Sequence, residues 1–294
     1  MELAATAAHT KAILAGFAMA LMLLSFQARA GCNINSWYLS MARTGAAKSP
    51  ESSGGHSMLA GTYVDAGCYT DALRELDLAD EKLTREGGSP DLKSTKAVAQ
   101  QGLRKLIISL QRLESGERTE TIESLFSLLD TNYATMVRMQ TTMMLGEILA
   151  PDSTESQWAK FDGYLRVLDP EGTVFWQVPR FRRLHEAYSG RVIDALRNLS
   201  KDLERESAPQ HHLALQVVLA EVMVIGKRFA SARIQCARTQ ETIQSELVDL
   251  RLRQRFLTAC LASWRSDTRV SRDPRTAVMI RLQEAALAKF EALY

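Results

Sequence analysis

The chain has 294 residues, of which 46% are hydrophobic and 24% are charged, and its formal net charge at pH 7 is +2. The apolar content is ample for the core of one large domain or of an extended repeat array. The near balance of charge argues against a nucleic-acid-binding protein that relies on overall positive charge.

Residues 1–30 are predicted to be a signal peptide. Lys11 precedes the apolar run AILAGFAMALMLLSF, which extends over 15 residues from Ala12 to Phe26. That length suits the core of a signal peptide and is short for a membrane span. The following Ala28-Arg29-Ala30 places small residues at the two positions that a signal peptidase reads, so cleavage is expected before Gly31.

Two other fates of this terminus are weighed against export of a cleaved chain. Cys32 suggests a lipoprotein, but a lipobox has an aliphatic residue three positions before its cysteine, where this chain has Arg29. An uncleaved anchor helix is the second alternative. No later apolar run is long enough for a membrane span, so no integral span is expected in the mature chain. The expected location is periplasmic or secreted.

All four cysteines follow the expected cleavage site, and an even number in an exported chain suggests two disulfides. Four cysteines allow three connectivities, and the sequence alone does not choose among them. Proximity in the chain favours Cys32 with Cys68 and Cys236 with Cys260. The alternative is that they are free thiols buried in a helical core.

The mature chain is predicted to be helical throughout. Residues 31–55 are expected to form a helix around Asn33–Arg43 and then a loop over 44–55, which is rich in small and polar residues. Residues 56–294 are expected to form about twelve helices of 10 to 20 residues. Segments such as DALRELDLADEKL place apolar residues on one stripe with the helical period, whereas sustained period-two alternation is almost absent.

One decapeptide pattern occurs twice, as GCYTDALREL at 67–76 and as GRVIDALRNL at 190–199. A helix that ends at glycine can turn sharply, because glycine adopts the left-handed conformation without steric cost. The small Ala72 or Ala195 then lies where two helices cross closely. Each copy therefore predicts the turn and the first half of the second helix in a helical hairpin.

The segment MLAGTYVDAGCYTDALRELDLA resembles a tetratricopeptide repeat (TPR). It matches that motif at eight positions: Leu59, Ala60, Tyr63, Gly67, Tyr69, Ala72, Leu76 and Ala79. Residues 184–199 match only from Gly190 onward. A third candidate, LAEVMVIGKRFASARIQC, matches at Leu219, Ala220, Gly226, Phe229 and Ala232, with one extra residue between its glycine and its aromatic residue.

The spacing of these copies departs from the family. Val192 and Phe229 lie 37 residues apart, whereas the TPR period is 34, and the middle of the chain has no clean consensus. The resemblance implies an all-α fold, a right-handed superhelix of antiparallel helix hairpins with degenerate repeats. The alternative is a helical bundle with a coincidental match.

The sequence contains none of the common catalytic, phosphate-binding or metal-binding motifs that we sought, including His-Glu-x-x-His, Gly-x-Ser-x-Gly and Gly-x-x-x-x-Gly-Lys. We therefore expect a non-enzymatic protein with no catalytic residues, no cofactor and no metal site. His185-Glu186 lacks a second histidine and is interpreted as structural.

Basic residues gather in two regions. Residues 179–191 carry four arginines beside Phe181 and Tyr188, and residues 248–294 carry nine basic residues against five acids. A solvated helix face explains such runs most simply. The functional alternative is an anionic partner, particularly at the basic carboxyl-terminal helices, and its binding would weaken as salt concentration rises.

The TPR resemblance implies a concave surface that binds segments of other proteins. That surface is lined by the first helix of each pair, and the matching positions are Asp65, Arg180, Leu184, Tyr188 and Glu221. The function expected is an exported scaffold that binds envelope or secretion-complex proteins, as in a secretion, pilus or wall-synthesis machine. The alternatives are a helical protein that binds or processes cell-wall glycan, and a periplasmic chaperone for one exported substrate.

Overall fold

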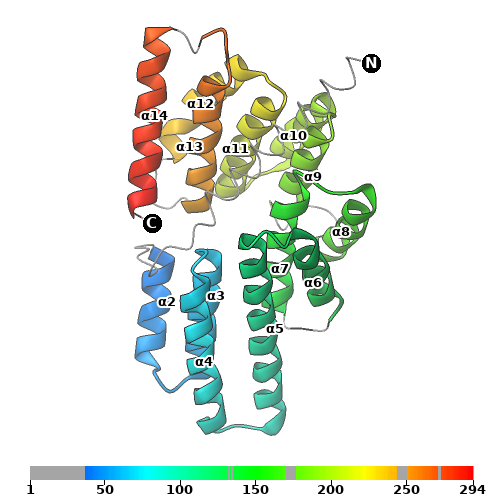
Figure 1. Ribbon diagram of the computed structural model, residues 1–294, viewed down its shortest axis with the longest axis vertical. Coiled ribbons are helices and arrows are strands. Elements are labelled where there is room, and N and C mark those ends of the chain that lie inside the picture. Colours follow the sequence, from blue (N-terminus) through cyan, green and yellow to red (C-terminus); the bar gives the residue numbers. More distant parts are fainter. Residues whose placement is uncertain are drawn as a thin grey trace. The chain divides into compact units, whose positions relative to one another are not determined.

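A computed structural model of the chain describes residues 37–131, 133, 135–169, 177–243, 250–270 and 273–293 (Figure 1). Throughout these residues the secondary structure is α-helical, with thirteen helices and no β-strand. The expected all-α class is thereby confirmed. The expected signal peptide, its cleavage site and Cys32 lie outside the described residues.

The helices belong to two compact units, of which one ends at Leu145 and the other begins at Gly146, within α7. The first unit contains α2 (Trp37–Lys48), α3 (Ser53–Asp65), α4 (Tyr69–Arg85), α5 (Pro90–Glu114), α6 (Arg118–Asp130) and most of α7 (Thr135–Leu149). The second contains the end of α7 followed by α8 (Glu155–Leu168), α9 (Gln177–Tyr188), α10 (Val192–Arg205), α11 (Pro209–Ile225), α12 (Phe229–Ile243), α13 (Leu250–Arg265) and α14 (Pro274–Leu293).

The loop expected over 44–55 is mostly helical. Helix α2 continues to Lys48 and α3 begins at Ser53, so only four residues connect them. Ser52, at the amino end of α3, makes no side-chain cap. Instead, Glu86 accepts hydrogen bonds from the Ser53 amide at 2.6 Å and from its hydroxyl at 2.9 Å. A distant carboxylate therefore supplies the cap that the local sequence lacks, at the end of the helix dipole that favours negative charge.

Lys96 holds this capping carboxylate in place. Its ammonium group lies 2.6 Å from Glu86, and the resulting hydrogen bond is the main reason that the pKa of Glu86 falls to about 2, with the Ser53 amide adding to the effect. The interaction joins the start of α3, the end of α4 and the first half of α5 within the first unit. It keeps Glu86 ionised over the whole physiological pH range.

Four helix pairs are joined by the same turn. In each turn one residue is left-handed; its amide donates to the carbonyl three residues earlier, and the next amide donates to the carbonyl five residues earlier. This is the Schellman arrangement, which satisfies the last carbonyls of the first helix. The left-handed residues are Gly67 (φ 74°), Gly116 (φ 89°), Gly190 (φ 84°) and Lys227 (φ 57°).

The packing after the turn also repeats. Five residues beyond the left-handed position stands a fully buried small residue, and nine residues beyond it stands a larger buried one. The first set is Ala72, Thr121, Ala195 and Ala232, and the second is Leu76, Leu125, Leu199 and Cys236. A small side chain lets the two helices of a pair approach closely, and the larger one fills the space one turn later. The α5–α6 pair is thus a further copy of this hairpin, which the sequence pattern did not reveal.

The register of the third candidate repeat requires a correction. Lys227, and not Gly226, takes the left-handed position, so Phe229 follows it by the same two residues as Tyr69 follows Gly67. The extra residue after Gly226 therefore moves the left-handed position to Lys227 and does not lengthen the turn. Gly226 is needed for a different reason, because a Cβ at this position would lie 2.4 Å from Cγ1 of Val192.

In the second unit, α11 is covered on two sides. Leu215, Val218 and Val222 pack with α9 and α10, whereas other residues of α11 pack with α12 and α13. That second set is Leu213, Ala214, Val217 and Ala220. A helix with apolar residues on most of its circumference is expected to be central, and α11 is the centre of this unit.

Glycine also allows α7 and α9 to approach each other closely. A Cβ at Gly146 would lie within 2.5 to 2.6 Å of three atoms of the Phe181 ring. Phe181 is fully buried and makes an edge-on contact with Phe161 of α8, with ring centroids 6.1 Å apart. The carboxyl end of α7 is thereby fixed against the helices that follow it.

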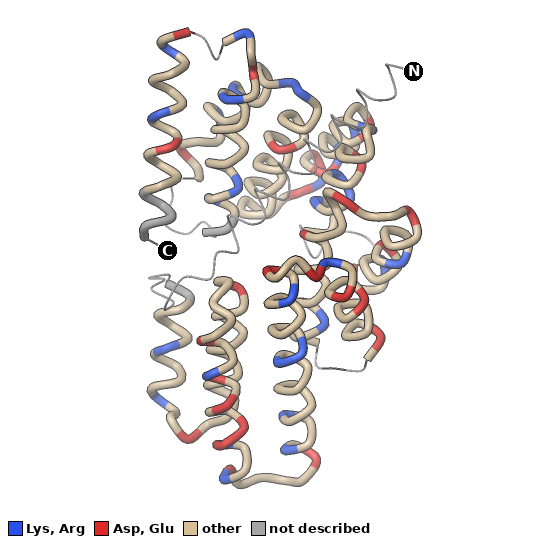
Figure 2. The backbone as a smooth tube through the Cα atoms, in the orientation of Figure 1, with Lys and Arg blue, Asp and Glu red and all other residues tan. Residues whose placement is uncertain are grey.

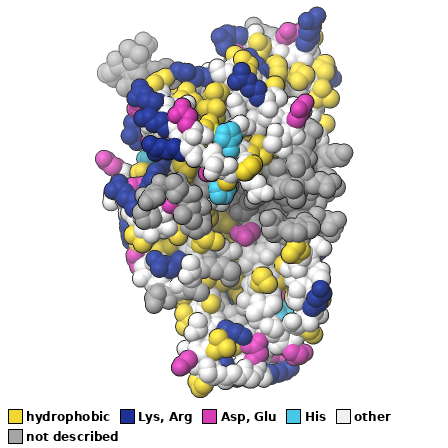
Figure 3. Space-filling model, turned by 180° about the vertical axis from the view of Figure 1, so that it is seen from behind, with side chains coloured by type: hydrophobic (Ala, Val, Ile, Leu, Met, Phe, Trp, Pro, Cys, Tyr) yellow, Lys and Arg dark blue, Asp and Glu magenta, His cyan; other side chains and the backbone are white. Residues whose placement is uncertain are grey.

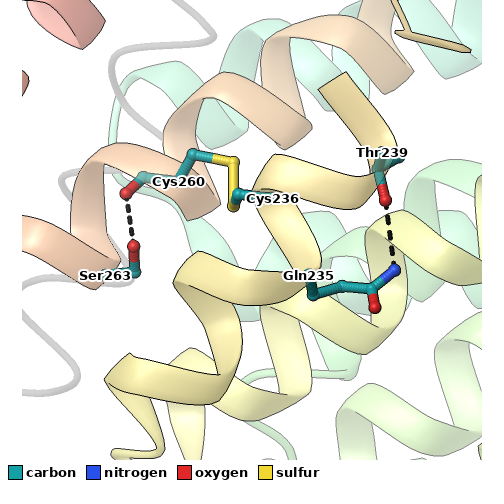
Figure 4. The surroundings of a disulfide bond; sticks show 5 residues. All are labelled: Gln235, Cys236, Thr239, Cys260 and Ser263. Carbon is teal, nitrogen blue, oxygen red and sulfur yellow. Dashed lines mark hydrogen bonds between the residues drawn. A yellow bond between two sulfur atoms is a disulfide. The ribbon is translucent and has the colours of Figure 1, made fainter. Parts of the chain in front are cut away.

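A disulfide joins α12 to α13 (Figure 4). It links Cys236 to Cys260, which confirms one of the two expected pairs. Beside it, the Ser263 hydroxyl donates to the Cys260 carbonyl at 2.6 Å, and Gln235 donates to Thr239 at 3.1 Å. The bond therefore connects two helices that belong to different hairpins. The pairing expected between Cys32 and Cys68 stays a prediction.

The shared turn predicts opposite effects for substitutions at its left-handed position. Gly190→Ala should lower the free energy of unfolding by about 1 kcal/mol. The added Cβ would meet no neighbouring atom, but the left-handed backbone conformation is unfavourable for alanine. Lys227→Gly should raise it by about 0.5–1 kcal/mol, since it relieves the same strain. Chemical denaturation measures both. Gly163→Ala is the control, because it lies in α8 with open space and should stabilise.

Loss of the disulfide should destabilise the second unit. The bond spans 24 residues, so replacing both Cys236 and Cys260 by serine should lower the free energy of unfolding by about 3 kcal/mol. Denaturant unfolding of the variant and the wild type, followed by fluorescence of Trp264 on α13, gives the difference. Equal stabilities would show that the bond does not restrict the unfolded chain.

Candidate functional site

The five residues expected to line one groove fall in both units. Asp65 is exposed at the end of α3 in the first unit, whereas Arg180, Leu184, Tyr188 and Glu221 belong to the second. Leu184 is 5% exposed and packs in the apolar core with Ala187 and Val218, so it is not available to a partner. The other three residues of the expected set in the second unit are Arg180, Tyr188 and Glu221.

Arg180 and Glu221 belong to a partly buried charge cluster of four residues, which also includes Glu147 and Arg255. The Glu147 carboxylate accepts from Arg180 and from Arg255, at 2.7 Å in both cases. Arg255 also donates from Nε to Glu221 at 2.8 Å. The cluster therefore connects the end of α7 with α9, α11 and α13, and it balances two positive charges with two negative ones.

Burial raises the cost of charge in this cluster. Only 4% of the Arg180 side chain and 13% of the Glu221 side chain are exposed. Burial raises the pKa of Glu221 to about 7, and the charge of Glu147 adds to this effect while Arg180 opposes it. The second carboxylate oxygen of Glu221, Oε2, is buried without a hydrogen-bond partner among the described residues. Glu221 is therefore poised to change its protonation state near neutral pH.

Tyr188 stands at the edge of the charge cluster. It is the last residue of α9, and 40% of its surface is exposed. Partial burial, followed by the charges of Glu221 and Glu147, raises the pKa of its hydroxyl to about 12. Tyr188 is therefore the member of the expected set that combines an exposed surface with electrostatic coupling to the cluster.

This arrangement serves packing more directly than chemistry. Each carboxylate of the cluster is paired with an arginine. Across the part of the chain that the structure describes, no group of three or more His, Cys, Asp or Glu is placed to hold a metal ion. Buried ion pairs of this kind fix the mutual orientation of helices at a cost in desolvation.

Sequence reasoning missed Glu147 and Arg255. They lie 108 residues apart, and Glu147 follows a methionine-rich stretch that carries no repeat consensus. The available signal was the placement of single charged residues within otherwise apolar helix faces. Such a residue is expected to find a buried partner, but its identity depends on tertiary packing.

The basic carboxyl-terminal helices hold less free charge than their composition implied. Arg255 belongs to the charge cluster, Arg265 pairs with Glu284, and Arg269 pairs with Asp267 at 3.1 Å. Arg233 of α12 also binds Asp267, at 3.1 Å. Two of these arginines, Arg255 and Arg265, therefore join different helices, whereas the Arg269–Asp267 pair is local.

Helix α14 exposes apolar side chains. Val278, Met279 and Leu282 are exposed by 48%, 37% and 58%, while Thr276 on the opposite side is buried. Figure 2 shows only isolated charged positions along this helix, and Figure 3 shows hydrophobic side chains gathered over it. None of the described helices is both long and apolar enough to cross a bilayer, so this stripe is not a membrane span.

Comparisons with models of protein families, with curated proteins and with solved structures found no match for this chain.

Glu221 should make stability depend on pH. Its folded-state pKa of about 7 lies above the 4.5 of an exposed glutamate, so the folded chain binds the proton more tightly. The free energy of unfolding should therefore fall by roughly 2 kcal/mol as pH rises from about 5 to about 8, and Glu221→Gln should remove that decrease. Urea unfolding at both pH values measures it. Glu241→Gln, at an exposed position on α12, is the control and should leave the decrease intact.

Proposed function

We propose that the chain is an exported, non-enzymatic scaffold with a TPR-like solenoid fold, which binds other proteins during assembly or stabilisation of a cell-envelope machine. The observation that carries this proposal is the turn repeated at Gly67, Gly116, Gly190 and Lys227, with the same buried positions after it. Repeated helical hairpins are the building units of solenoids, whose extended surfaces recognise other proteins.

Contacts within the second unit support the proposal. Helices α9, α11 and α13 are the first members of successive hairpins and are joined by the charge cluster, while α10 and α12 alternate with them in the chain. In a solenoid the first helices of successive pairs line the concave face. Tyr188 then offers an exposed aromatic ring on that face, and tyrosine is favoured at protein interfaces.

Two further observations support export and protein binding. The Cys236–Cys260 bond fits an oxidising compartment such as the periplasm. The apolar side chains exposed on α14 are the second observation, because exposed apolar patches often mark sites of protein interaction. A binding surface explains the stripe without invoking catalysis.

Site-specific photocrosslinking tests the scaffold. A photoreactive amino acid is placed at Tyr188 and, as the control, at the exposed Lys201 on α10, and the chain is crosslinked in intact source cells. We expect one or two discrete envelope proteins, in stoichiometric yield, at position 188 and not at position 201. Circular dichroism confirms that both variants fold.

Two outcomes would contradict this function. Identical products from the two positions would mean that the contact is not specific to the face that carries Tyr188. Capture of cell-wall fragments alone would favour the glycan-binding alternative over a protein scaffold.

A further inference from the structure

A cleft of about 480 Å³ lies among α8, α9 and the start of α10, away from the charge cluster. Its size falls within the range of small-molecule sites, which is about 300–1,000 Å³. Three arginines and two acids line it beside one tryptophan and one histidine. Figure 3 shows basic side chains gathered on the side of the second unit that carries these helices. Neither the TPR resemblance nor the charge cluster accounts for this cleft.

Asp162 fixes two of the three arginines. Arg182 donates from Nε to its Oδ1 at 2.8 Å, and Arg166 donates from Nε to its Oδ2, also at 2.8 Å. These two arginines hold the pKa of Asp162 below its usual range against the effect of burial. The two arginines therefore neutralise the charge of Asp162, so this carboxylate does not repel an anion strongly.

The second acid, Glu186, is also neutralised. It accepts from Arg183 at 2.7 Å and from the amide nitrogen of Asn198 at 3.3 Å. Arg183 in turn binds Asp202 at 2.8 Å, so it is held on the outer side of the cleft by two carboxylates. Both acids of the cleft are thus paired before any ligand arrives.

Arginine donors remain for a ligand. Arg182 is bound only through Nε, and its two terminal amino groups have no hydrogen-bond partner among the described residues and are not buried. Arg191 is exposed and forms no ion pair within the described part of the chain, and its charge lowers the pKa of the neighbouring His185. A pair of anchored or unpaired guanidinium groups suits carboxylate and phosphate oxygens, which they bind through paired hydrogen bonds.

Two aromatic side chains, Trp158 and His185, line the cleft together. The Trp158 and His185 rings stack with centroids 3.8 Å apart and an angle of 10° between their planes. Burial, followed by the charge of Arg191, lowers the pKa of His185, so its ring is neutral at physiological pH and stacks without the cost of a buried charge. Because both residues line the cleft, a ring or another compact body beside the ligand's charged group can pack against them.

We propose that this cleft binds a small organic anion, in which a carboxylate or a phosphate group is carried on a ring and the oxyanion bridges Arg182 and Arg191. Such a site is distinct from the scaffold surface at Tyr188 and would give the protein a small-molecule ligand of its own. Binding of such an anion can be measured on the protein alone, without knowledge of any protein partner.

Isothermal titration calorimetry with matched probes tests the site. Glucose 6-phosphate and glucuronate offer a phosphate and a carboxylate on the same kind of ring, glucose is the neutral control, and inorganic phosphate lacks the ring. We expect saturable binding of one charged sugar with a stoichiometry of one and none of glucose. The charged sugar that binds identifies the oxyanion. Weaker binding of inorganic phosphate than of glucose 6-phosphate would support a contact between the ring and the aromatic side chains of the cleft.

Two variants and a control locate the binding. Arg191→Gln removes an arginine without an intramolecular ion pair, and Arg182→Lys keeps a charge for Asp162 but loses the forked donors; each should weaken binding about tenfold. Arg197→Gln makes the same charge change farther along α10, where Arg197 pairs with the exposed Asp194, and should bind like the wild type. Absence of saturable binding by all charged probes up to about 10 mM would overturn the proposal. Equal loss in the Arg197→Gln control would overturn it as well.

Discussion

The helix hairpins of this protein depend on one backbone constraint, a single left-handed residue between two helices. That residue lets the last carbonyls of the first helix be satisfied while the chain reverses, and the next residue already accepts the first hydrogen bond of the second helix. Three of the four turns use glycine and the fourth accepts Lys227 at a cost in strain. Because the turn fixes how the second helix departs, the small residue five positions later must lie at the crossing, where even one methylene more would be felt.

The charge cluster changes what the predicted groove can do. Positions inherited from the TPR resemblance were expected to face a partner, yet Arg180 and Glu221 are committed to Glu147 and Arg255 inside the second unit. These ion pairs add to the apolar packing of α11 against α9 and α13, and their geometry restricts how the three helices are oriented. In the proposed scaffold, recognition on this face would therefore rest on exposed residues such as Tyr188.

Local patterns predicted the helical class, the hairpin at Gly67 and the Cys236–Cys260 pair, because each depends on residues close together in the chain. Gly116 was expected to separate two helices, but it was not recognised as a copy of the repeated turn, because Arg118 replaces the aromatic residue of the consensus and Thr121 replaces its alanine. The helix start at Ser53 was missed because its cap is Glu86, 33 residues away. The charge cluster and the cleft could not be predicted from the sequence for the same reason. They join charged residues from several helices, and helical periodicity does not indicate which helix faces meet.

The disulfide has a mechanical consequence for a protein proposed to work inside an assembly. A chain of stacked hairpins pulled from its carboxyl end would peel away one helix after another, since each helix is held mainly by its neighbours. The bond between Cys236 and Cys260 interrupts that sequence, because the residues between them cannot be drawn out while it is intact. The sequence separation of 24 corresponds to roughly 80 Å of extended chain that stays inaccessible to tension. Oxidation thus sets how far the molecule can lengthen under load, independently of how stable its fold is at rest.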